Sequence, residues 1–228
     1  MTQDHLFNAK DAAGYAAAQL VEDGMSIGLG TGSTAACFIR HLSERIQREG
    51  LKIQGAPTSK SSYELAKKGG ISLIDIHEMS ALDLTVDGVD QITPEKQMIK
   101  GGGGALLREK IVAQMSREMI VIADETKQVE SLEGYLVPIE IIPFGDKGTI
   151  LKLEEKGYIG GLRKIGNQIY ITENHNYIVD VQLPRKKDLN MMNDEIKSIS
   201  GVVETGLFLN LAGRVIIGKK NGSVERLP

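Results

Sequence analysis

The stretch from residue 83 to residue 109 carries the side chains with the clearest chemistry in this chain: carboxylates, one lysine and a run of four glycines. In chain order they are Asp87, Gly88, Val89, Asp90, Lys100, Gly101, Gly102, Gly103, Gly104 and Glu109. Carboxylates and a lysine can move protons on a small polar molecule and stabilise the charge that develops there. Consecutive glycines cost backbone entropy and are typical of places where backbone N–H groups approach an anion. The stretch therefore predicts a site for acid–base chemistry, and the alternative is a solvated surface loop.

A second polar turn, Gly28-Leu-Gly-Thr-Gly-Ser-Thr34, lies between an expected strand at 25–29 and an expected helix at 35–48. The order strand, glycine-rich turn, helix places an anion at a helix N-terminus, where unpaired N–H groups and the helix dipole both favour negative charge. The hydroxyls of Thr31, Ser33 and Thr34 add hydrogen-bond donors, and Gly32 lies between them. This turn predicts a phosphate site.

The same turn also matches the dinucleotide fingerprint G-x-G-x-x-G/A, from Gly30 to Ala35. In that fold the following strand ends in an acidic residue that binds a ribose hydroxyl. Here the following strand, expected at 51–56, ends in Pro57-Thr58-Ser59 instead. The chain also lacks the P-loop pattern G-x-x-x-x-G-K-[ST]. Dinucleotide binding and nucleotide hydrolysis are therefore the weaker alternatives.

The first part of the chain alternates between expected strands and helices. The strands are expected at 25–29, 51–56, 71–74, 82–86 and 119–123, and the helices at 10–21, 35–48, 59–68 and 105–115. This alternation predicts an α/β fold with a Rossmann-like parallel sheet and helices on both faces. Ligands bind at the carboxyl ends of the strands in such sheets. We therefore expect the polar clusters at 31–34, 87–90 and 124–127 to converge.

The pattern changes after residue 135. Strands are expected at 136–142, 158–164, 168–172, 177–182 and 201–205, with helices at 148–156 and 186–198. We interpret this order as a small ferredoxin-like α+β module. A last strand at 214–218 is expected to return to the first sheet. The predicted domains are therefore 1–131 with 207–228, and 132–206.

Composition sets the class of protein. The chain has 228 residues, 41% hydrophobic and 25% charged, and a net charge of −3, which argues against nucleic acid as a partner. It has no apolar run near 18 residues and no signal-peptide pattern, so we expect no membrane partner and a cytoplasmic location. One cysteine, Cys37, excludes an internal disulfide. The four histidines lack metal-ligand spacing, so no metal site is expected.

Several of these motifs occur together in one known family. Thr31–Thr34, Asp87–Asp90, Lys100–Gly103 and Glu109 resemble the ribose-5-phosphate isomerases of type A. The resemblance extends nearly end to end, through Pro57–Ser59, Ala123–Lys127 and Gly201–Phe208. Motifs that match in order are far more specific than any one of them. The departures are Glu173–Asn176 and the basic run Arg185–Lys187, which leave the subunit contacts open.

The resemblance implies reversible interconversion of ribose 5-phosphate and ribulose 5-phosphate, without metal or organic cofactor, in a homo-oligomer, with a homodimer favoured. It makes Glu109 the base that moves a proton between carbons 2 and 1. It assigns Asp87, Asp90 and Lys100 to the sugar hydroxyls and the enediolate. The remaining implied substrate contacts are Thr31, Gly32, Ser33, Thr34, Gly88, Val89, Gly101, Gly102, Gly103, Lys127 and Lys10.

A hypothesis about the base follows: partial burial and the nearby acids raise the pKa of Glu109, and Lys100 opposes that shift. Two rival functions remain open at this point. One is a related sugar-phosphate enzyme such as glucosamine-6-phosphate deaminase, which needs provision for an amine and a longer sugar. The other is a non-catalytic sugar-phosphate sensor, which needs neither Glu109 nor the acid pair.

Overall fold

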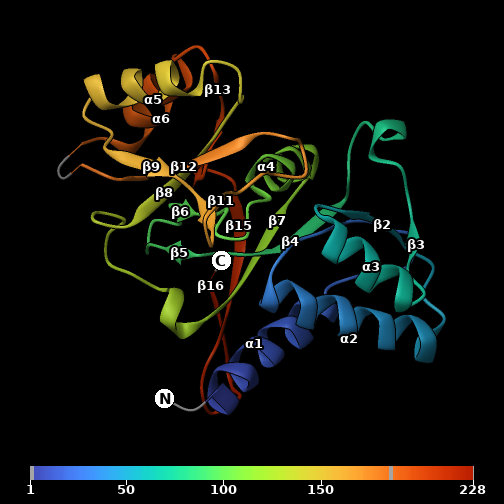
Figure 1. Ribbon diagram of the computed structural model, residues 1–228. Helices are drawn as coiled ribbons and strands as arrows, with labels where there is room; N and C mark the ends of the chain where they lie inside the picture. Colours follow the sequence, from blue (N-terminus) through green and yellow to red (C-terminus); the bar gives the residue numbers. More distant parts are fainter. Residues whose placement is uncertain (1–2, 185–186, 228) are drawn as a thin grey trace. The chain divides into compact units, whose positions relative to one another are not determined.

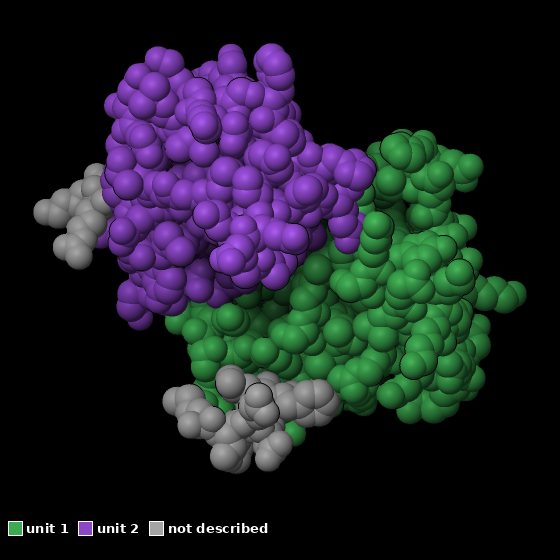
Figure 2. Space-filling view, viewed as in Figure 1, with its two compact units in different colours: residues 1–89, 108–128, 211–228 green, residues 90–107, 129–210 purple. Residues whose placement is uncertain are grey.

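The computed structural model describes residues 3–184 and 187–227 (Figure 1). Arg185 and Lys186, which belong to the basic run and to the start of an expected helix, lie outside the described residues. The chain forms two compact units, coloured separately in Figure 2. The first comprises residues 1–89, 108–128 and 211–228, and the second comprises 90–107 and 129–210.

The first unit contains a seven-stranded sheet in the order β16-β15-β7-β4-β1-β2-β3. All neighbouring strands are parallel except β15 and β16, which pair antiparallel at one edge of the sheet. Its strands are β1 (Ser26–Leu29), β2 (Gln54–Pro57), β3 (Ser72–Leu73), β4 (Leu84–Gly88), β7 (Met119–Asp124), β15 (Ala212–Gly218) and β16 (Val224–Leu227). Its helices are α1 (Gln3–Ala18), α2 (Ser33–Glu49), α3 (Lys60–Lys68) and most of α4 (Leu106–Met115), with short 3₁₀ turns η1 (Ile76–Glu78) and η2 (Glu125–Lys127). The predicted α/β class is confirmed.

Strand β1 shows why helices cover both faces of this sheet. All four of its residues are buried, and successive side chains point to opposite faces. Ile27 and Leu29 join the apolar cluster that α1 and α2 cover. Gly28 faces the other side, where an added Cβ would lie 2.5 Å from Val112 of α4. The sheet is therefore buried on both sides, as its continuous apolar strands require.

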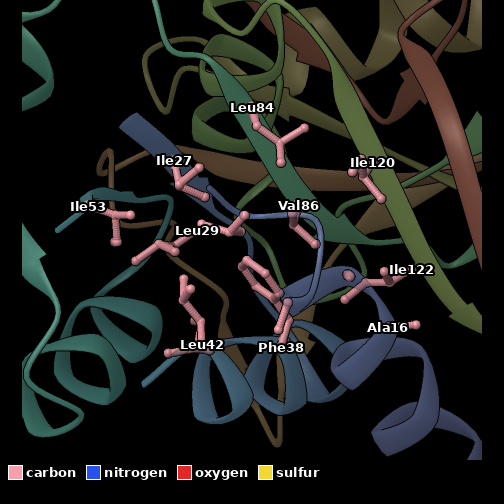
Figure 3. Packing of buried hydrophobic residues seen from close by; sticks show 14 of the residues in the cluster. Ala16, Ile27, Leu29, Phe38, Leu42, Ile53, Leu84, Val86, Ile120 and Ile122 are labelled. Atoms are coloured by element: carbon pink, nitrogen blue, oxygen red, sulfur yellow. The ribbon is translucent and has the colours of Figure 1, made fainter. Parts of the chain in front are cut away.

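The core of the first unit lies between α2 and the central strands. Figure 3 shows Phe38 and Leu42 of α2 beside Leu29, with Val86 and Ile122 nearby. All five of these side chains are fully buried. This packing fixes α2 against the sheet and so fixes the turn from which α2 begins.

The strand order reverses between β1 and β4. From β1 the chain moves through β2 to β3 at one edge, and it then returns to place β4 on the other side of β1. Such a reversal leaves a crevice at the carboxyl ends of the two strands, because their connections leave in opposite directions. The residues that follow β1 and end β4 therefore occupy the place where ligands bind in open α/β sheets.

The second unit contains a four-stranded antiparallel sheet in the order β13-β8-β12-β9. Its elements are β8 (Leu136–Ile141), α5 (Asp146–Glu155), β9 (Gly160–Leu162), β12 (Tyr177–Gln182), α6 (Leu189–Lys197) and β13 (Val202–Thr205). Both helices contribute buried residues to the core of this sheet, Leu153 from α5 and Ile196 from α6. This is the ferredoxin-like order expected from the sequence.

A three-stranded sheet in the order β14-β6-β5 explains why the two units do not follow the predicted borders. Its strands are β5 (Gln91–Ile92), β6 (Met98–Ile99) and β14 (Leu207–Phe208). Strand β6 pairs with both β5 and β14, and Gly206, just before β14, accepts the N–H of Lys100 and donates to Pro138 O of β8, so the segment 90–107 clusters with the second unit. Two-residue strands carry no period of their own, so the sequence did not indicate them.

Two further expectations about elements were wrong. The first helix extends over Gln3–Ala18 rather than 10–21, because its polar first turns carry no apolar period. The strand expected at 158–164 is divided, and a small hairpin of β10 (Lys164–Ile165) and β11 (Gln168–Ile169) follows it. Gly166, with φ 60°, forms the turn. No helix within 3–184 and 187–227 has the length and apolar character to cross a bilayer.

The stability of the second unit is expected to depend on pH through Glu195. Lys187 Nζ donates to Glu195 Oε2 at 2.6 Å, and the Tyr158 hydroxyl donates to the same oxygen. These bonds, that from Lys187 first, lower the pKa of Glu195 from 4.5 to about 2. A lowered pKa in the folded state means that the carboxylate stabilises the fold above pH 4.5 and loses this contribution as the pH falls towards 2.

We therefore expect Glu195→Gln to lower the free energy of unfolding at pH 7 and to flatten its decline between pH 4.5 and 2. Urea unfolding at a series of pH values measures this. Glu155→Gln, which removes an exposed ion pair with Lys152, is the matched control and should leave the decline unchanged. An unchanged pH profile in the Glu195 variant would contradict the assignment.

Candidate active site

The turn after β1 and the end of β4 meet at the point where the strand order reverses. The backbone N–H of Thr31 donates to Asp87 Oδ1 at 3.0 Å, and the N–H of Gly88 donates to the same oxygen at 2.7 Å. Asp87 is 1% exposed. A carboxylate buried to this degree needs such donors, because burial removes its water. The hydrogen bond from Thr31 therefore ties the anion-binding turn to the first member of the acid pair.

The Thr31 hydroxyl is fixed by residues at the end of β2. Thr31 Oγ1 lies 2.7 Å from Thr58 Oγ1, and it donates to Ser59 Oγ at 2.8 Å. Thr58 and Ser59 stand where a dinucleotide fold has its ribose-binding acid. The structure gives both residues a role that the sequence did not indicate: they orient Thr31.

The N-terminus of α2 has the features of an anion site. Its N-cap is Gly32, with φ 102°, and no side chain caps the helix. Lys10 Nζ donates to Ser33 Oγ at 3.0 Å and lies 4.0 Å from Asp124 Oδ2 at the end of β7. The turn thus combines uncapped helix N–H groups with hydroxyls and a lysine charge, which favours a phosphate.

Three polar strand ends therefore converge within the first unit, as the sequence predicted. Thr31 contacts Asp87 directly, and Lys10 connects Ser33 with Asp124. Lys127, the last residue of η2, is half-buried, and its Nζ makes no hydrogen bond or ion pair within the described part of the chain. Its expected contact with substrate stays a prediction.

A pocket of about 230 Å³ lies beside this turn. It is lined by Gly30, Gly32, Ser33, Ala36, Ile39, Ser61, Ser62 and Leu65. Its lining combines backbone of the glycine turn with hydroxyls of α3 and apolar side chains of α2. The turn is therefore accessible from the side of α2 and α3.

Glu109 lies in the first turn of α4 and is 5% exposed. Val112, three residues later on the same helix, packs on Gly28 of β1. Three residues advance a helix by about 4.5 Å. Because α4 follows β4 in a parallel crossover, its N-terminus lies towards the carboxyl ends of the strands. Glu109 is therefore displaced from Gly28 towards the end of the sheet that carries Thr31 and Asp87, and it is not a solvated surface residue.

The other candidates belong to the second unit. Asp90 Oδ2 accepts the N–H of Gly102 at 2.7 Å, and the N–H of Asp90 donates to Ile99 O at 2.9 Å. Lys100 is 2% exposed, and its Nζ lies 5.5 Å from the ring centre of Phe208. Gly102 and Gly103 are exposed, as a backbone surface for a ligand has to be. Within this unit the structure brings Asp90 and the glycine run together.

Two side chains that the sequence did not single out also hold the glycine run. Arg163 donates to Gly101 O at 2.9 Å and to Gly102 O at 3.1 Å, and the Tyr170 hydroxyl donates to Gly103 O at 3.2 Å. Neither residue belongs to a recognisable motif, and both lie more than 60 residues from the glycines in sequence. Only the fold reveals them.

Within 3–184 and 187–227, no three His, Cys, Asp or Glu side chains are grouped so that they could hold a metal ion. Buried acids such as Asp87 and Asp124 instead accept hydrogen bonds from backbone N–H groups. The arrangement in the first unit can bind an anion and place a buried carboxylate near it, which suits proton transfer on a phosphorylated substrate.

The contact between Gly30 and Asp87 yields a test of this geometry. A Cβ added at Gly30 would overlap the Asp87 carboxylate. We expect Gly30→Ala to lower the free energy of unfolding by about 1–3 kcal/mol, because the carboxylate or the turn has to move. Denaturant unfolding measures this. Gly148→Ala in α5, where an added Cβ meets no atom within 4 Å, is the control and should be neutral or stabilising. Equal stability of both variants would show that the turn is not packed on Asp87.

Comparison with known proteins places the chain in a family. Residues 54–222 match the family model of ribose 5-phosphate isomerase A (phosphoriboisomerase A). The ribose-5-phosphate isomerase A of Bacillus mycoides is 50% identical over 221 residues, which cover 96% of this chain and 100% of that protein. That of Protochlamydia amoebophila is 50% identical over 219 residues, 95% of this chain and 94% of that protein.

Solved structures agree. Ribose 5-phosphate isomerase A from Methanocaldococcus jannaschii superposes with a TM-score of 0.90 at 39% identity, covering 96% of this chain and 97% of that chain. A D-ribose-5-phosphate isomerase in complex with phospho-erythronic acid also gives a TM-score of 0.90, at 38% identity and 96% coverage of both chains. On this evidence the chain belongs to the ribose 5-phosphate isomerase A family.

Proposed function

We propose that this protein interconverts ribose 5-phosphate and ribulose 5-phosphate through an enediolate, with Glu109 as the base. The observation that carries the proposal is a buried glutamate in the same unit as an anion-binding turn, in a chain of this family. The solved relative that binds phospho-erythronic acid supports it. That acid joins a phosphate to a planar, negatively charged carboxylate, which resembles an enediolate with a phosphate at its far end.

The reaction moves one proton between adjacent carbons. A base removes the weakly acidic proton from carbon 2, the electrons delocalise over carbons 1 and 2 and their oxygens, and the protonated base returns a proton to carbon 1. One carboxylate can perform both transfers, because the first makes it the acid that the second needs. Glu109 is assigned this role, and its raised pKa stays a prediction.

The phosphate is assigned to the turn after β1. The uncapped N-terminus of α2 offers N–H groups, and Thr31, Ser33 and Thr34 offer hydroxyls. Lys10 adds a positive charge next to Ser33. These groups favour a dianion at one end of the substrate and so orient the chain of carbons.

Asp87, Asp90 and Lys100 are assigned to the sugar hydroxyls and the enediolate. The charge of Lys100 and backbone N–H groups of the glycine run, such as that of Gly103, stabilise the negative charge that develops on the oxygens, while the N–H of Gly102 holds Asp90. A general base contributes about 10²–10⁴-fold, so this charge stabilisation has to supply much of the remaining rate enhancement. Asp87 and Asp90 offer acceptors for hydroxyl protons.

Glu109→Gln tests the assignment of the base. The amide keeps the size of the side chain but cannot accept the proton, so kcat is expected to fall by at least about 10²–10⁴-fold with little change in substrate affinity. A continuous spectroscopic assay of ribulose 5-phosphate formation measures kcat, and calorimetry measures binding. Glu64→Gln, on the exposed part of α3, is the control and should be unchanged. A Glu109 variant with near-normal kcat would refute the role.

The same assay separates the rival functions. A sugar-phosphate sensor would bind ribose 5-phosphate and form no ribulose 5-phosphate, and a deaminase would instead release ammonia from an amino sugar phosphate. Addition of EDTA tests the expected independence from metal, because a metal-assisted isomerase loses activity when its metal is removed.

The oligomer is also a proposal: a homodimer in the cytoplasm, with contacts through the second unit. That unit exposes large apolar side chains, among them Phe144 at 89%, Ile165 at 69% and Ile159 at 61%. Exposed apolar side chains of this size are typical of surfaces that another chain covers. Sedimentation equilibrium is expected to give twice the mass of the chain, and Phe144→Ser is expected to weaken the dimer. A monomer at micromolar concentration would contradict the proposal.

A further inference from the structure

The peptide group between Gly101 and Gly102 is held at both ends by charged side chains. Its carbonyl oxygen, that of Gly101, accepts a hydrogen bond from Arg163 Nη1 at 2.9 Å. Its N–H, that of Gly102, donates to Asp90 Oδ2 at 2.7 Å. A guanidinium, a peptide and a carboxylate therefore form one line of hydrogen bonds within the second unit.

Arg163 is itself fixed before it reaches the glycines. Its Nε and Nη2 donate to the two carboxylate oxygens of Asp180 at 2.9 and 2.6 Å. This fork leaves Nη1 to bind the carbonyl oxygens of Gly101 and Gly102. Arg163 follows β9 and its backbone N–H bonds Ile178 O of β12, the strand that carries Asp180. The guanidinium is therefore mounted on the ferredoxin-like sheet with little freedom to turn.

Tyr170 extends the same support along the glycine run. Its hydroxyl donates to Gly103 O, and the Arg163 guanidinium carbon lies 5.9 Å from its ring centre. Burial raises the pKa of Tyr170 above its ordinary value of 10.0, so the hydroxyl keeps its proton and remains a donor at neutral pH. Three consecutive carbonyls, those of residues 101, 102 and 103, thus accept hydrogen bonds from Arg163 and Tyr170.

The line of bonds has a consequence for Asp90. A positive charge beside the carbonyl oxygen of a peptide polarises that peptide group, and this makes its N–H a stronger hydrogen-bond donor. The Gly102 N–H then fixes the position of the Asp90 carboxylate more firmly. The space between Gly102 and Asp90 is also limited. A Cβ at Gly102 would lie 2.7 Å from Asp90 Oδ1, so only glycine allows the carboxylate to approach this closely.

We propose that Arg163 is a positioning residue for Asp90, acting through the Gly101–Gly102 peptide, and that Asp180 and Tyr170 hold it in place. The proposal rests on the proposed catalytic role of Asp90. Arg163 acts from behind the glycine run, and its effect reaches the substrate through the carboxylate and the backbone N–H groups it orients. A residue in this role contributes to kcat more than to the stability of the fold.

A mutant cycle tests the proposal. Arg163→Met removes the charge and keeps much of the side-chain volume, and we expect kcat to fall by about 10- to 100-fold, as displaced catalytic groups commonly cost. The thermal midpoint should remain close to that of the parent chain. In the background of Asp90→Asn, the same Arg163 substitution should lower kcat by less than about 3-fold, because the group through which Arg163 acts is already lost.

Two further measurements separate positioning from a general structural role. Guanidinium at millimolar concentration should restore part of the kcat of Arg163→Ala, because the cation can occupy the space between Asp180 and the glycine carbonyls. Arg214→Met is the matched control: it removes an arginine that forks onto Glu118 with two bonds of 2.7 Å in the other unit, and it should leave kcat unchanged.

The outcomes are distinct. If the fold-decreases in kcat of the two single variants multiply in the double variant, the positioning role of Arg163 is overturned while the role of Asp90 stands. An Arg163 variant with parental kcat would have the same consequence. If Asp90→Asn alone keeps parental kcat, the proposed role of Asp90 fails, and the positioning role fails with it. A loss of kcat that only follows a lower thermal midpoint, without rescue by guanidinium, would also overturn it.

Discussion

The buried carboxylate of Asp87 is the constraint on which the first unit depends. At 1% exposure it has lost its water, and the N–H groups of Thr31 and Gly88 replace that water. The turn after β1 can bring Thr31 close enough only because Gly30 leaves room for the carboxylate. The hydrogen bond from Thr31 thus ties the turn after β1 to the carboxylate at the end of the neighbouring strand β4. It places an anion-binding helix N-terminus beside an acid.

The second unit solves a related problem with a different device. The glycine run has no side chains to hold it, so three of its four carbonyls, those of residues 101, 102 and 103, accept hydrogen bonds from Arg163 and Tyr170. These bonds fix the path of a run that would otherwise have many backbone conformations open to it. In both units, glycine-rich backbone is therefore held in place by hydrogen bonds to charged side chains, Asp87 in the first unit and Asp90 and Arg163 in the second. This suits a reaction whose intermediate is negatively charged.

Much of this organisation could be predicted from the sequence, because it depends on local patterns. Alternating apolar strands and helices indicated the parallel sheet, and the polar residues at Thr31, Asp87 and Asp124 indicated the strand ends that converge on the candidate site. The segment 90–107 was placed in the wrong unit because the contacts that tie it to the second unit, such as the bond from the Lys100 N–H to Gly206 O, join residues more than 100 apart in sequence. Arg163 and Tyr170 were missed for the same reason: their contacts are made across the fold, and no spacing announces them. The burial of Glu109 could likewise not be predicted from the sequence, because it follows from how α4 packs on the sheet, with Val112 against Gly28.

The central claim is that one buried carboxylate carries a proton between two carbons of a bound pentose phosphate. The most direct measurement follows deuterium by NMR and mass spectrometry while the enzyme converts ribose 5-phosphate labelled with deuterium at carbon 2 in ordinary water. The account predicts ribulose 5-phosphate that has lost part or all of the label at carbon 1, since a protonated carboxylate exchanges with solvent before it returns the proton. Complete transfer of the label to carbon 1 that continues at an undiminished rate in Glu109→Gln, as in a hydride shift that needs no base, would contradict it.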